Sequence, residues 1–497
     1  EIDSEIIENL SYYKMNQIQV DISGLNTKEG KEYDKNIDNL DQVENVAKFI
    51  KNFTWNIAGK LSFDEVLYFG YRIIEKYSLA QYIIRSEFPY LLIDEYQDTN
   101  PLQNKIVNIL SEEEINIAVI GDIGQSIYSF QGADYKEFEN FNLLNSPKDI
   151  KKFVIKSNRR STQNIINFLN YFRREDINLD AQIGVDNPQA DKLVTFIIDS
   201  KEDTSAEEIF EILPEDTKVL SRKWVEAFKY IKGLDKSQKD LIKKIYYFYR
   251  YVLDRDLYTE IDAKKETWID VTIDIVKLRN AYKNNDFSII FELLEKKFKM
   301  YEKLMNFSEE SCNNINDFLE FLDEIFEDFD TNKKLKEIIE EINIKIDEYN
   351  FEMTEKFTYS KKDDLKYHSK LYESLDKLKY ITAKKITEEI FSDNNKYMTI
   401  HQSKGKEFKN VLVNLEPSKF DKNADPIDTI CKPNMFGEKI DESEYSRMAY
   451  VAFSRAKEGL FIHLKGGNEI KERIKSHLES YIDEYEIESK FYNFEVI

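Results

Sequence analysis

Two adjacent carboxylates, Asp94 and Glu95, follow the apolar run LLI at residues 91–93. The run predicts a short buried strand, and in an open α/β sheet ligands bind beyond the carboxyl ends of the strands. Carboxylates at that edge can hold Mg²⁺ through their oxygen atoms and can orient a water molecule for attack on a phosphate. For an Asp-Glu pair considered alone, a solvated turn after a strand is the more common explanation.

The next predicted strand, INIAVI at 115–120, runs into the segment GDIGQSIYSFQGAD at 121–134. Its glycines permit a tight turn, and Gln125 can hydrogen-bond a phosphate oxygen or an attacking water molecule. Tyr128 and Phe130 are two positions apart, so they lie on one face of an extended segment. Such rings can stack on nucleic-acid bases, although a pair considered alone is more often part of a hydrophobic core.

Apolar runs separated by polar or helical stretches predict strands in two blocks of the chain. The first block lies at 88–93, 115–120, 151–156, 192–198 and 217–221, and the second at 397–401, 410–415 and 459–463. This alternation favours a mostly parallel sheet and an α/β fold. Between about 235 and 395 the sequence is dense in Lys, Glu, Asp, Ile and Leu with almost no Gly or Pro, which indicates a helical module that splits the sheet.

Composition indicates a globular protein with more than one domain. The 497 residues are 41% hydrophobic and include 31 Tyr and 33 Phe, which is ample material for packed cores. The formal charge of −23 opposes nucleic-acid binding over the whole surface, so any such site must be a local groove. Cys312 and Cys431 match no metal or disulfide spacing. With no long apolar run and no signal peptide, the sequence predicts a cytoplasmic protein that does not contact membranes.

Two segments, IDEYQDTN (93–100) and VIGDIGQSIYSFQGAD (119–134), resemble the Walker B segment and the coupling segment after it in superfamily 1 DNA helicases of the UvrD/Rep type. Other stretches are similar to that family's motifs and follow its order along the chain: LSFDEVLYFGYRII (61–74), SNRRSTQNI (157–165), MTIHQSKGKEF (398–408) and EYSRMAYVAFSRAKEGLFI (444–462). The resemblance implies two RecA-like P-loop NTPase domains with a largely helical accessory insertion. The implied domains are a first RecA-like domain at 1–150, incomplete at its N-terminus, a second at 151–255 and 391–497, and the insertion at 256–390.

The resemblance also implies roles for matching residues, with ATP and Mg²⁺ as cofactors. Asp94 binds Mg²⁺, Glu95 acts as the base that orients water, and Gln125 senses the γ-phosphate. Arg160 and Arg455 reach the same phosphate as arginine fingers supplied by the same chain. An arginine suits that role because its planar, permanently charged fork can meet two phosphate oxygens at once.

Residues in the 398–408 segment carry the remaining implied roles. Glu407 accepts a hydrogen bond from the nucleotide ribose, and Lys404 and Gly405 shape the loop beside it. Thr399 and His401 link DNA contact to the nucleotide cleft, although a single histidine in a strand is usually structural. The resemblance further implies that Tyr128 and Phe130 lie under single-stranded DNA.

Four departures from the family pattern stand out. Arg159 replaces the usual aromatic residue, Gln131 replaces an arginine after the aromatic pair, and Lys406 replaces an apolar residue. The fourth is larger, because the 497 residues contain no phosphate-binding loop of the form G-x-x-x-x-G-K-[ST]. Either the chain is truncated at its N-terminus, or it is a natural variant that cannot bind ATP in the usual way. The first residue, Glu1, and the retained catalytic set favour truncation.

The sequence therefore predicts an ATP-dependent helicase or translocase that moves 3′ to 5′ on single-stranded DNA. Its expected partners are single-stranded and partly duplex DNA and a nuclease or repair protein, in repair, recombination or phage defence. A weaker resemblance, to the helicase-like component of Gabija defence systems, underlies the last of these pathways. The alternative is a non-catalytic helicase-like scaffold or DNA-binding protein without ATP turnover.

Overall fold

The structure is a computed structural model of the 497-residue chain. It describes residues 61, 63–111, 115–129, 132–139, 141, 151–174, 180–185, 192–200, 204–251, 268–286, 288–289, 292, 309–351, 356–357, 369–390, 395–415, 425–437 and 440–497. The chain divides into two compact units. Unit 1 comprises Glu1–Lys156, Glu175–Asp180 and Asn434–Tyr450, and unit 2 comprises Ser157–Arg174, Ala181–Pro433 and Val451–Ile497.

Unit 1 is built on two parallel strands, β1 (Tyr90–Ile93) and β2 (Asn116–Val119), which are joined through α6 (Pro101–Ser111). Parallel strands require such a crossover, because a tight turn can only reverse the chain. The register pairs Ile93 with Val119, so both strands end at the same edge. The other described elements of this unit are α4 (Phe63–Lys76), α5 (Ser78–Glu87), η2 (Tyr96–Asp98), η3 (Ile123–Gln125), α7 (Tyr135–Glu139) and most of α21 (Ile440–Phe453).

Unit 2 contains a six-stranded sheet in which all neighbouring strands are parallel. Its spatial order is β10 (Tyr492–Val496), β5 (Val194–Asp199), β9 (Ala456–Lys465), β8 (Phe408–Asn414), β6 (Thr217–Ser221) and β7 (Tyr397–Thr399). A separate two-residue pair, β3 (Ser157–Asn158) and β4 (Ile183–Gly184), lies outside this sheet.

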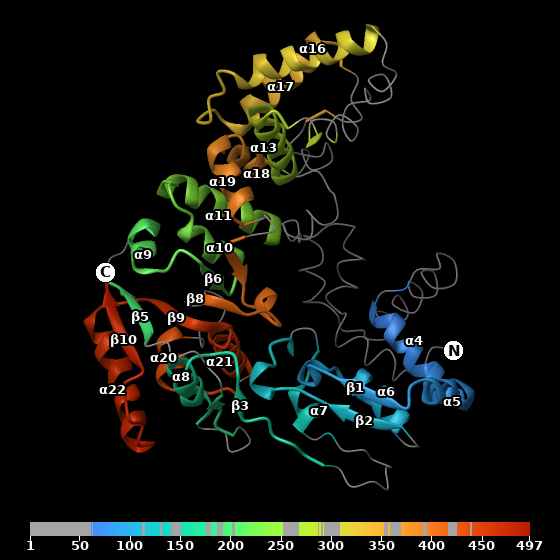
Figure 1. The fold of residues 1–497 in the computed structure, drawn as a ribbon, viewed down its shortest axis with the longest axis vertical. Coiled ribbons are helices and arrows are strands. Elements are labelled where there is room, and N and C mark those ends of the chain that lie inside the picture. The colour runs from blue at the N-terminus through green and yellow to red at the C-terminus, as the bar shows by residue number, and fades with distance from the viewer. Residues whose placement is uncertain are drawn as a thin grey trace, which may run out of the picture. The chain divides into compact units, whose positions relative to one another are not determined.

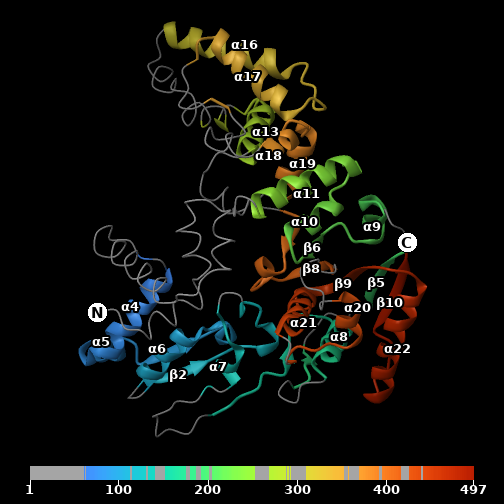
Figure 2. The same ribbon diagram turned by 180° about the vertical axis from the view of Figure 1, so that it is seen from behind.

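Helices cover both faces of the six-stranded sheet. Every residue of β5 is buried, and because side chains alternate between the two faces of a strand, both faces must be covered. On one face Phe196 packs against Phe168 of α8 (Gln163–Arg173), and on the other Ile197 belongs to a hydrophobic core that includes α9 (Ala206–Ile212). Figures 1 and 2 show α9 and α10 (Trp224–Ala227) on one side of the sheet, with α8, α20 (Pro426–Cys431) and α22 (Asn468–Glu484) on the other.

The regular elements that the structure describes in unit 2 between β6 and β7 are helices, joined by turns and loops. In α17 (Leu335–Glu348) the buried residues Ile338, Ile342 and Ile346 recur every four positions, which gives the helix one apolar face. That face joins a continuous hydrophobic core with neighbouring helices. Besides α10 and the short helix η5 (Phe228–Tyr230), the helices are α11 (Lys236–Tyr251), α13 (Trp268–Asn284), α16 (Glu309–Phe326), α17, α18 (Ser369–Leu375) and α19 (Tyr380–Ile390), labelled in Figure 1.

The α/β fold and the helical module are confirmed, and all predicted strands but one have a counterpart. The strand predicted at 151–156 is wrong, because these residues have no regular secondary structure and Phe153 is 83% exposed. An apolar run becomes a strand only where a neighbouring strand and a core accept it. The domain boundaries at 150, 255 and 390 remain a prediction. In the described part of the chain, no helix is long and apolar enough to span a membrane.

Candidate active site

The two carboxylates that follow β1 lie at the exposed edge of unit 1. Glu95 adopts a left-handed backbone conformation with φ of 54°, which is uncommon for a residue other than glycine. Its amide donates a hydrogen bond of 2.9 Å to Asp94 Oδ1. Gln97 Nε2 donates to Glu95 Oε2 at 2.5 Å, so the Glu95 side chain is held by a neighbouring amide. A strained backbone at a strand end is typical of residues held in place for function.

Gln97 is fully buried and connects the ends of the two strands. Its Oε1 atom accepts a hydrogen bond of 3.1 Å from the Asp122 amide. The Asp122 carboxylate in turn accepts from Gln125 Nε2 at 3.0 Å and from the Gly124 amide at 3.1 Å. The side chain of Gln125 is therefore oriented through a chain of hydrogen bonds that begins at Glu95. A Cβ atom on Gly121 would overlap Gln97 Oε1, so a larger residue there would displace the Gln97 side chain.

A cavity of about 440 Å³ adjoins these residues. Its polar lining comes from Asp94, Glu95, Asp98, Thr99 and Gln103, and its apolar lining comes from α4, α6 and the end of β1. Cavities of several hundred cubic ångströms with a few polar groups are typical of small-molecule sites.

Tyr128 lies in the electrostatic field of the same carboxylates. Burial raises the pKa of its hydroxyl, and the charges of Asp98 and Glu95 raise that pKa further. Tyr128 is therefore a neutral, half-buried ring close to the strand ends.

The carboxylate oxygens at this edge fit Mg²⁺ only if other ligands complete its coordination shell. No group of three or more His, Cys, Asp or Glu side chains among the described residues could hold a metal by itself. Mg²⁺ commonly takes one or two carboxylates and completes its shell with water and substrate phosphates. Asp94 and Glu95, which are exposed at the strand end, fit that arrangement.

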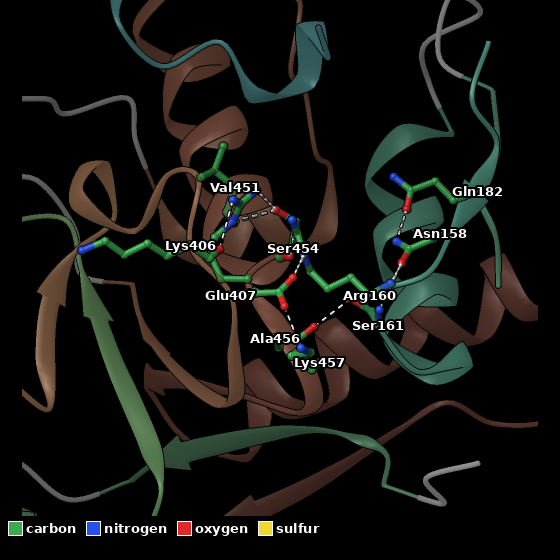
Figure 3. A network of polar contacts seen from close by, with 11 residues as sticks. Asn158, Arg160, Ser161, Gln182, Lys406, Glu407, Val451, Ser454, Ala456 and Lys457 are labelled. Atoms are coloured by element: carbon green, nitrogen blue, oxygen red, sulfur yellow. Dashed lines mark hydrogen bonds and ion pairs between the residues drawn. The ribbon is translucent and has the colours of Figure 1, made fainter. Parts of the chain in front are cut away.

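Unit 2 gathers a second set of charged side chains around Ser454, shown in Figure 3. Arg160 Nε donates to Glu407 Oε2 at 3.1 Å, and Arg160 Nη1 donates to the Ser454 carbonyl at 3.1 Å. Lys457 Nζ donates to the other oxygen of Glu407 at 2.6 Å. The Lys457 ammonium and then the Arg160 guanidinium hold the pKa of Glu407 below its ordinary value of 4.5. Asn158 Oδ1 accepts a hydrogen bond of 2.9 Å from the Arg160 amide, which fixes the backbone that carries Arg160.

Arg455 follows Ser454 in the chain and is 2% exposed. Its Nη2 and Nε atoms donate to Ser454 Oγ at 2.8 and 3.2 Å, and Nε also donates to the Val451 carbonyl at 3.1 Å. Nη1 donates to the Lys406 carbonyl at 3.3 Å. A buried cation held by several oxygen atoms has a fixed position and a fixed direction.

The loop between β7 and β8 carries the other predicted residues of this unit. Thr399 ends β7, and its Oγ1 atom accepts from the Gln402 amide at 3.3 Å, while His401 begins the short helix η7 (His401–Ser403). Gly405 has φ of 74°, which glycine adopts without strain, and Lys404 precedes it. The loop then delivers Glu407 to the cluster around Ser454.

The structure thus places the predicted residues in two groups. Asp94, Glu95, Gln125 and Tyr128 lie near the strand ends of unit 1, and Arg160, Thr399, His401, Lys404, Gly405, Glu407 and Arg455 lie in unit 2. Phe130 lies outside the described residues. Sequence reasoning missed the residues that hold these groups, namely Gln97, Asp122, Asn158, Ser454 and Lys457. Each lies within or beside a quoted motif, which was the one signal available for finding them.

Comparison with known proteins gives matches to the N-terminal and the C-terminal domain of one family. Residues 3–144 match the UvrD/REP helicase N-terminal domain, and residues 197–466 match the UvrD-like helicase C-terminal domain.

Three relatives illustrate the range of similarity. The ATP-dependent DNA helicase PcrA of Leuconostoc citreum is 35% identical over 129 residues, which cover 25% of this chain and 16% of that protein. An ATP-dependent helicase/nuclease subunit of Latilactobacillus sakei is 38% identical over 98 residues, 19% of this chain and 11% of that protein. A probable DNA helicase II homolog of Mycoplasma capricolum is 24% identical over 491 residues, 87% of this chain and 64% of that protein. The alignments therefore span less than two thirds of each relative's length.

Replacing Gly121 by alanine tests the hydrogen-bond chain of unit 1. We expect Gly121→Ala to destabilise the protein by about 1–3 kcal/mol, because the new methyl group displaces the buried Gln97 amide. The matched control is Gly70→Ala in α4, where a Cβ atom meets nothing within 4 Å. That change should stabilise the helix by about 0.5–1 kcal/mol. Urea unfolding measures both, and equal effects of the two substitutions would contradict the close approach at Gly121.

A pH titration tests the Glu407 network. Because the pKa of Glu407 is lowered in the folded protein, its contribution to stability is present above its ordinary pKa and is lost as the pH falls through the folded value. Lys457→Met should move the pKa of Glu407 upward, as followed by carboxyl ¹³C NMR. Lys409→Met is the control, since Lys409 lies near Asp216 and Glu458 instead. An unchanged Glu407 titration in Lys457→Met would show that the ion pair does not form in solution.

Proposed function

This chain belongs to the UvrD-like helicase family, and from that membership we propose that it is an ATP-dependent motor that moves along single-stranded DNA. The observation that carries the proposal is the polar edge of unit 1. There Asp94, Glu95 and Gln125 follow the carboxyl ends of two parallel strands, and Gln97 and Asp122 connect Glu95 to Gln125. Such an edge is where open α/β sheets bind nucleotides.

In this proposal the residues of unit 1 perform the hydrolytic chemistry. Asp94 holds Mg²⁺, which when bound neutralises charge on the ATP phosphates. Glu95 accepts a hydrogen bond from the attacking water and orients it, and Gln97 keeps the Glu95 carboxylate in place. Gln125 donates to the terminal phosphate through the amide that Asp122 now binds.

The residues of unit 2 supply positive charge and contacts to the nucleoside. Arg455 keeps a fixed direction through its bonds to Ser454, Val451 and Lys406, as an arginine finger requires. Arg160 exchanges its ion pair with Glu407 for a phosphate oxygen, since both acceptors are anionic. Glu407 is then available to accept a hydrogen bond from the ribose, while Lys404 and Gly405 shape the loop.

DNA contact in the proposal relies on stacking and local polar groups, because the net charge of −23 repels phosphates. Tyr128 and Phe130 stack on bases, and each stacking contact contributes roughly 1–3 kcal/mol to binding. Thr399 and His401 contact the DNA from the β7–β8 loop. The helical module between β6 and β7 serves as the accessory domain. A 3′-to-5′ direction follows from the family resemblance.

The biological setting is proposed on the same basis. A relative described as part of a helicase/nuclease supports a nuclease partner for this chain as well. We propose repair, recombination or phage defence as the pathway and the cytoplasm as the place where the motor acts. The second candidate function, a DNA-binding scaffold without ATP turnover, is favoured by the lack of a G-x-x-x-x-G-K-[ST] loop in the 497 residues.

Substituting the two arginines tests the proposed hydrolysis. We expect Arg455→Lys and Arg160→Lys each to slow single-stranded-DNA-stimulated ATP hydrolysis by at least about 100-fold, because lysine lacks the planar fork. Arg473→Lys is the control, since Arg473 pairs with Asp428 on the surface of unit 2. Duplexes with a 3′ or a 5′ single-stranded tail report direction, and only the 3′-tailed duplex should be unwound.

The assay is run on this chain and on any longer product of its gene that carries a phosphate loop. Hydrolysis that depends on Arg455 in either protein supports the motor. Single-stranded DNA binding without hydrolysis in both would overturn it in favour of the scaffold.

A further inference from the structure

One face of α21 holds the backbone segment that follows β2. Glu444, Arg447 and Tyr450 are spaced three apart and so lie along one side of the helix. Ser129 Oγ donates a hydrogen bond to Glu444 Oε2, and Arg447 Nε donates to the Ser126 carbonyl at 2.6 Å.

Tyr450 completes this contact at the start of the segment. A Cβ atom on Gly124 would lie 3.2 Å from Tyr450 Cε1, so the tyrosine ring packs closely against the glycine backbone. Three consecutive points of the segment, Gly124, Ser126 and Ser129, are therefore held by one helix within unit 1.

Arg447 is enclosed to a degree that is rare for a cation. It is 2% exposed, and its Nη1 atom donates to the Met435 carbonyl. Its guanidinium carbon lies 5.2 Å from the ring centre of Tyr135 and 5.9 Å from that of Phe436. Burial lowers the pKa of the guanidinium, and the charge of Glu444 opposes that shift. Burying a charge among aromatic rings and carbonyls is costly, which argues for a specific task.

The residues that α21 holds alternate with the residues that carry proposed roles. Gln125 lies between Gly124 and Ser126, and Tyr128 lies between Ser126 and Ser129. Fixing the backbone at the held positions sets the directions in which the side chains between them project. Asp122 then completes the orientation of Gln125 by accepting from its amide.

We propose that Arg447 is a positioning residue that fixes the Ser126 carbonyl and thereby presents Gln125 to the nucleotide and Tyr128 to DNA. Glu444 is its auxiliary, because it anchors the end of the same segment through Ser129. We call the contacts of Glu444, Arg447 and Tyr450 with residues 124–129 the clamp. The functional part of this inference rests on the proposed function, whereas the existence of the clamp does not.

Hydrogen exchange of the full chain tests the clamp directly. The Gln125 and Ser126 amides bond to the Asp122 and Ile123 carbonyls at 2.8 and 3.2 Å, so their exchange reports opening of the segment. Arg447→Met should raise their exchange rates by about tenfold or more, while amides of β5 and β8 stay unchanged. Arg473→Met, on the exposed surface, is the control and should change neither. A folded Arg447→Met protein with normal exchange in this segment would overturn the proposal.

A milder change covers the case in which Arg447→Met does not fold. Ser129→Ala removes only the donor to Glu444, and it should raise exchange in the same segment by a smaller factor. Arg447→Lys, which keeps the charge, should restore part of the protection lost in Arg447→Met. Normal exchange in Ser129→Ala would contradict the anchoring role of Glu444.

A double-mutant cycle separates the clamp from the proposed function. If Arg447 acts through Tyr128, then Arg447→Met weakens binding of single-stranded DNA, and adding Arg447→Met to Tyr128→Ala weakens it little further. Additive losses would indicate a merely structural role and would overturn the positioning claim. A parent chain that neither binds DNA nor hydrolyses ATP would refute the proposed function alone, since the exchange result would still decide the clamp.

Discussion

Parallel strands in register begin at one edge of a sheet and end at the other, and the two candidate sites depend on that constraint. In unit 1 the pairing of Ile93 with Val119 brings the residues after β1 beside the residues after β2. The Tyr96 amide can then donate to the Ile120 carbonyl at 2.9 Å. In unit 2 Phe408 pairs with Ala456, so Glu407, which precedes β8, and Ser454, which precedes β9, lie at the same edge of the sheet. Without this register, the residues that flank neighbouring strands would not lie side by side, and neither candidate site would form.

A different kind of interaction holds the side chains of each site in place. In unit 1 the central connection is the neutral amide of Gln97, fully buried and bonded at both ends. Removing it would take the acceptor from the partly buried Asp122 amide and the donor from Glu95, which would destabilise this edge. In unit 2 the Arg160, Glu407 and Lys457 network is exposed to solvent by a third or more. Exposed ion pairs add little stability, so this network orients side chains more than it stabilises the unit.

Much of this arrangement was predictable from the sequence, and the remainder depends on long-range register. The strand before Asp94 and the strand before Gly121 were predicted from apolar runs, and the resemblance then gave roles to Gln125, Arg455 and Glu407. The partners of these residues were not predictable in the same way. Asp122 lies 25 positions from Gln97, and Lys457 lies 50 from Glu407, so their contacts follow from tertiary packing.

The short strand β10, with its mixed sequence YNFEV, was missed because it has no apolar run. The run KKFVIK at 151–156 misled for the opposite reason, since its apolar residues stay exposed.

We propose that a chain with a net charge of −23 acts on DNA through a local site built on Tyr128. The most direct measurement is the equilibrium binding of a fluorescein-labelled oligodeoxythymidylate, followed by anisotropy at low and at physiological salt. We expect saturable binding that weakens with salt and that Tyr128→Ala reduces by about tenfold or more, because a stacked base is lost. No binding at low salt, or binding that Tyr128→Ala leaves unchanged, would rule out a DNA site built on Tyr128.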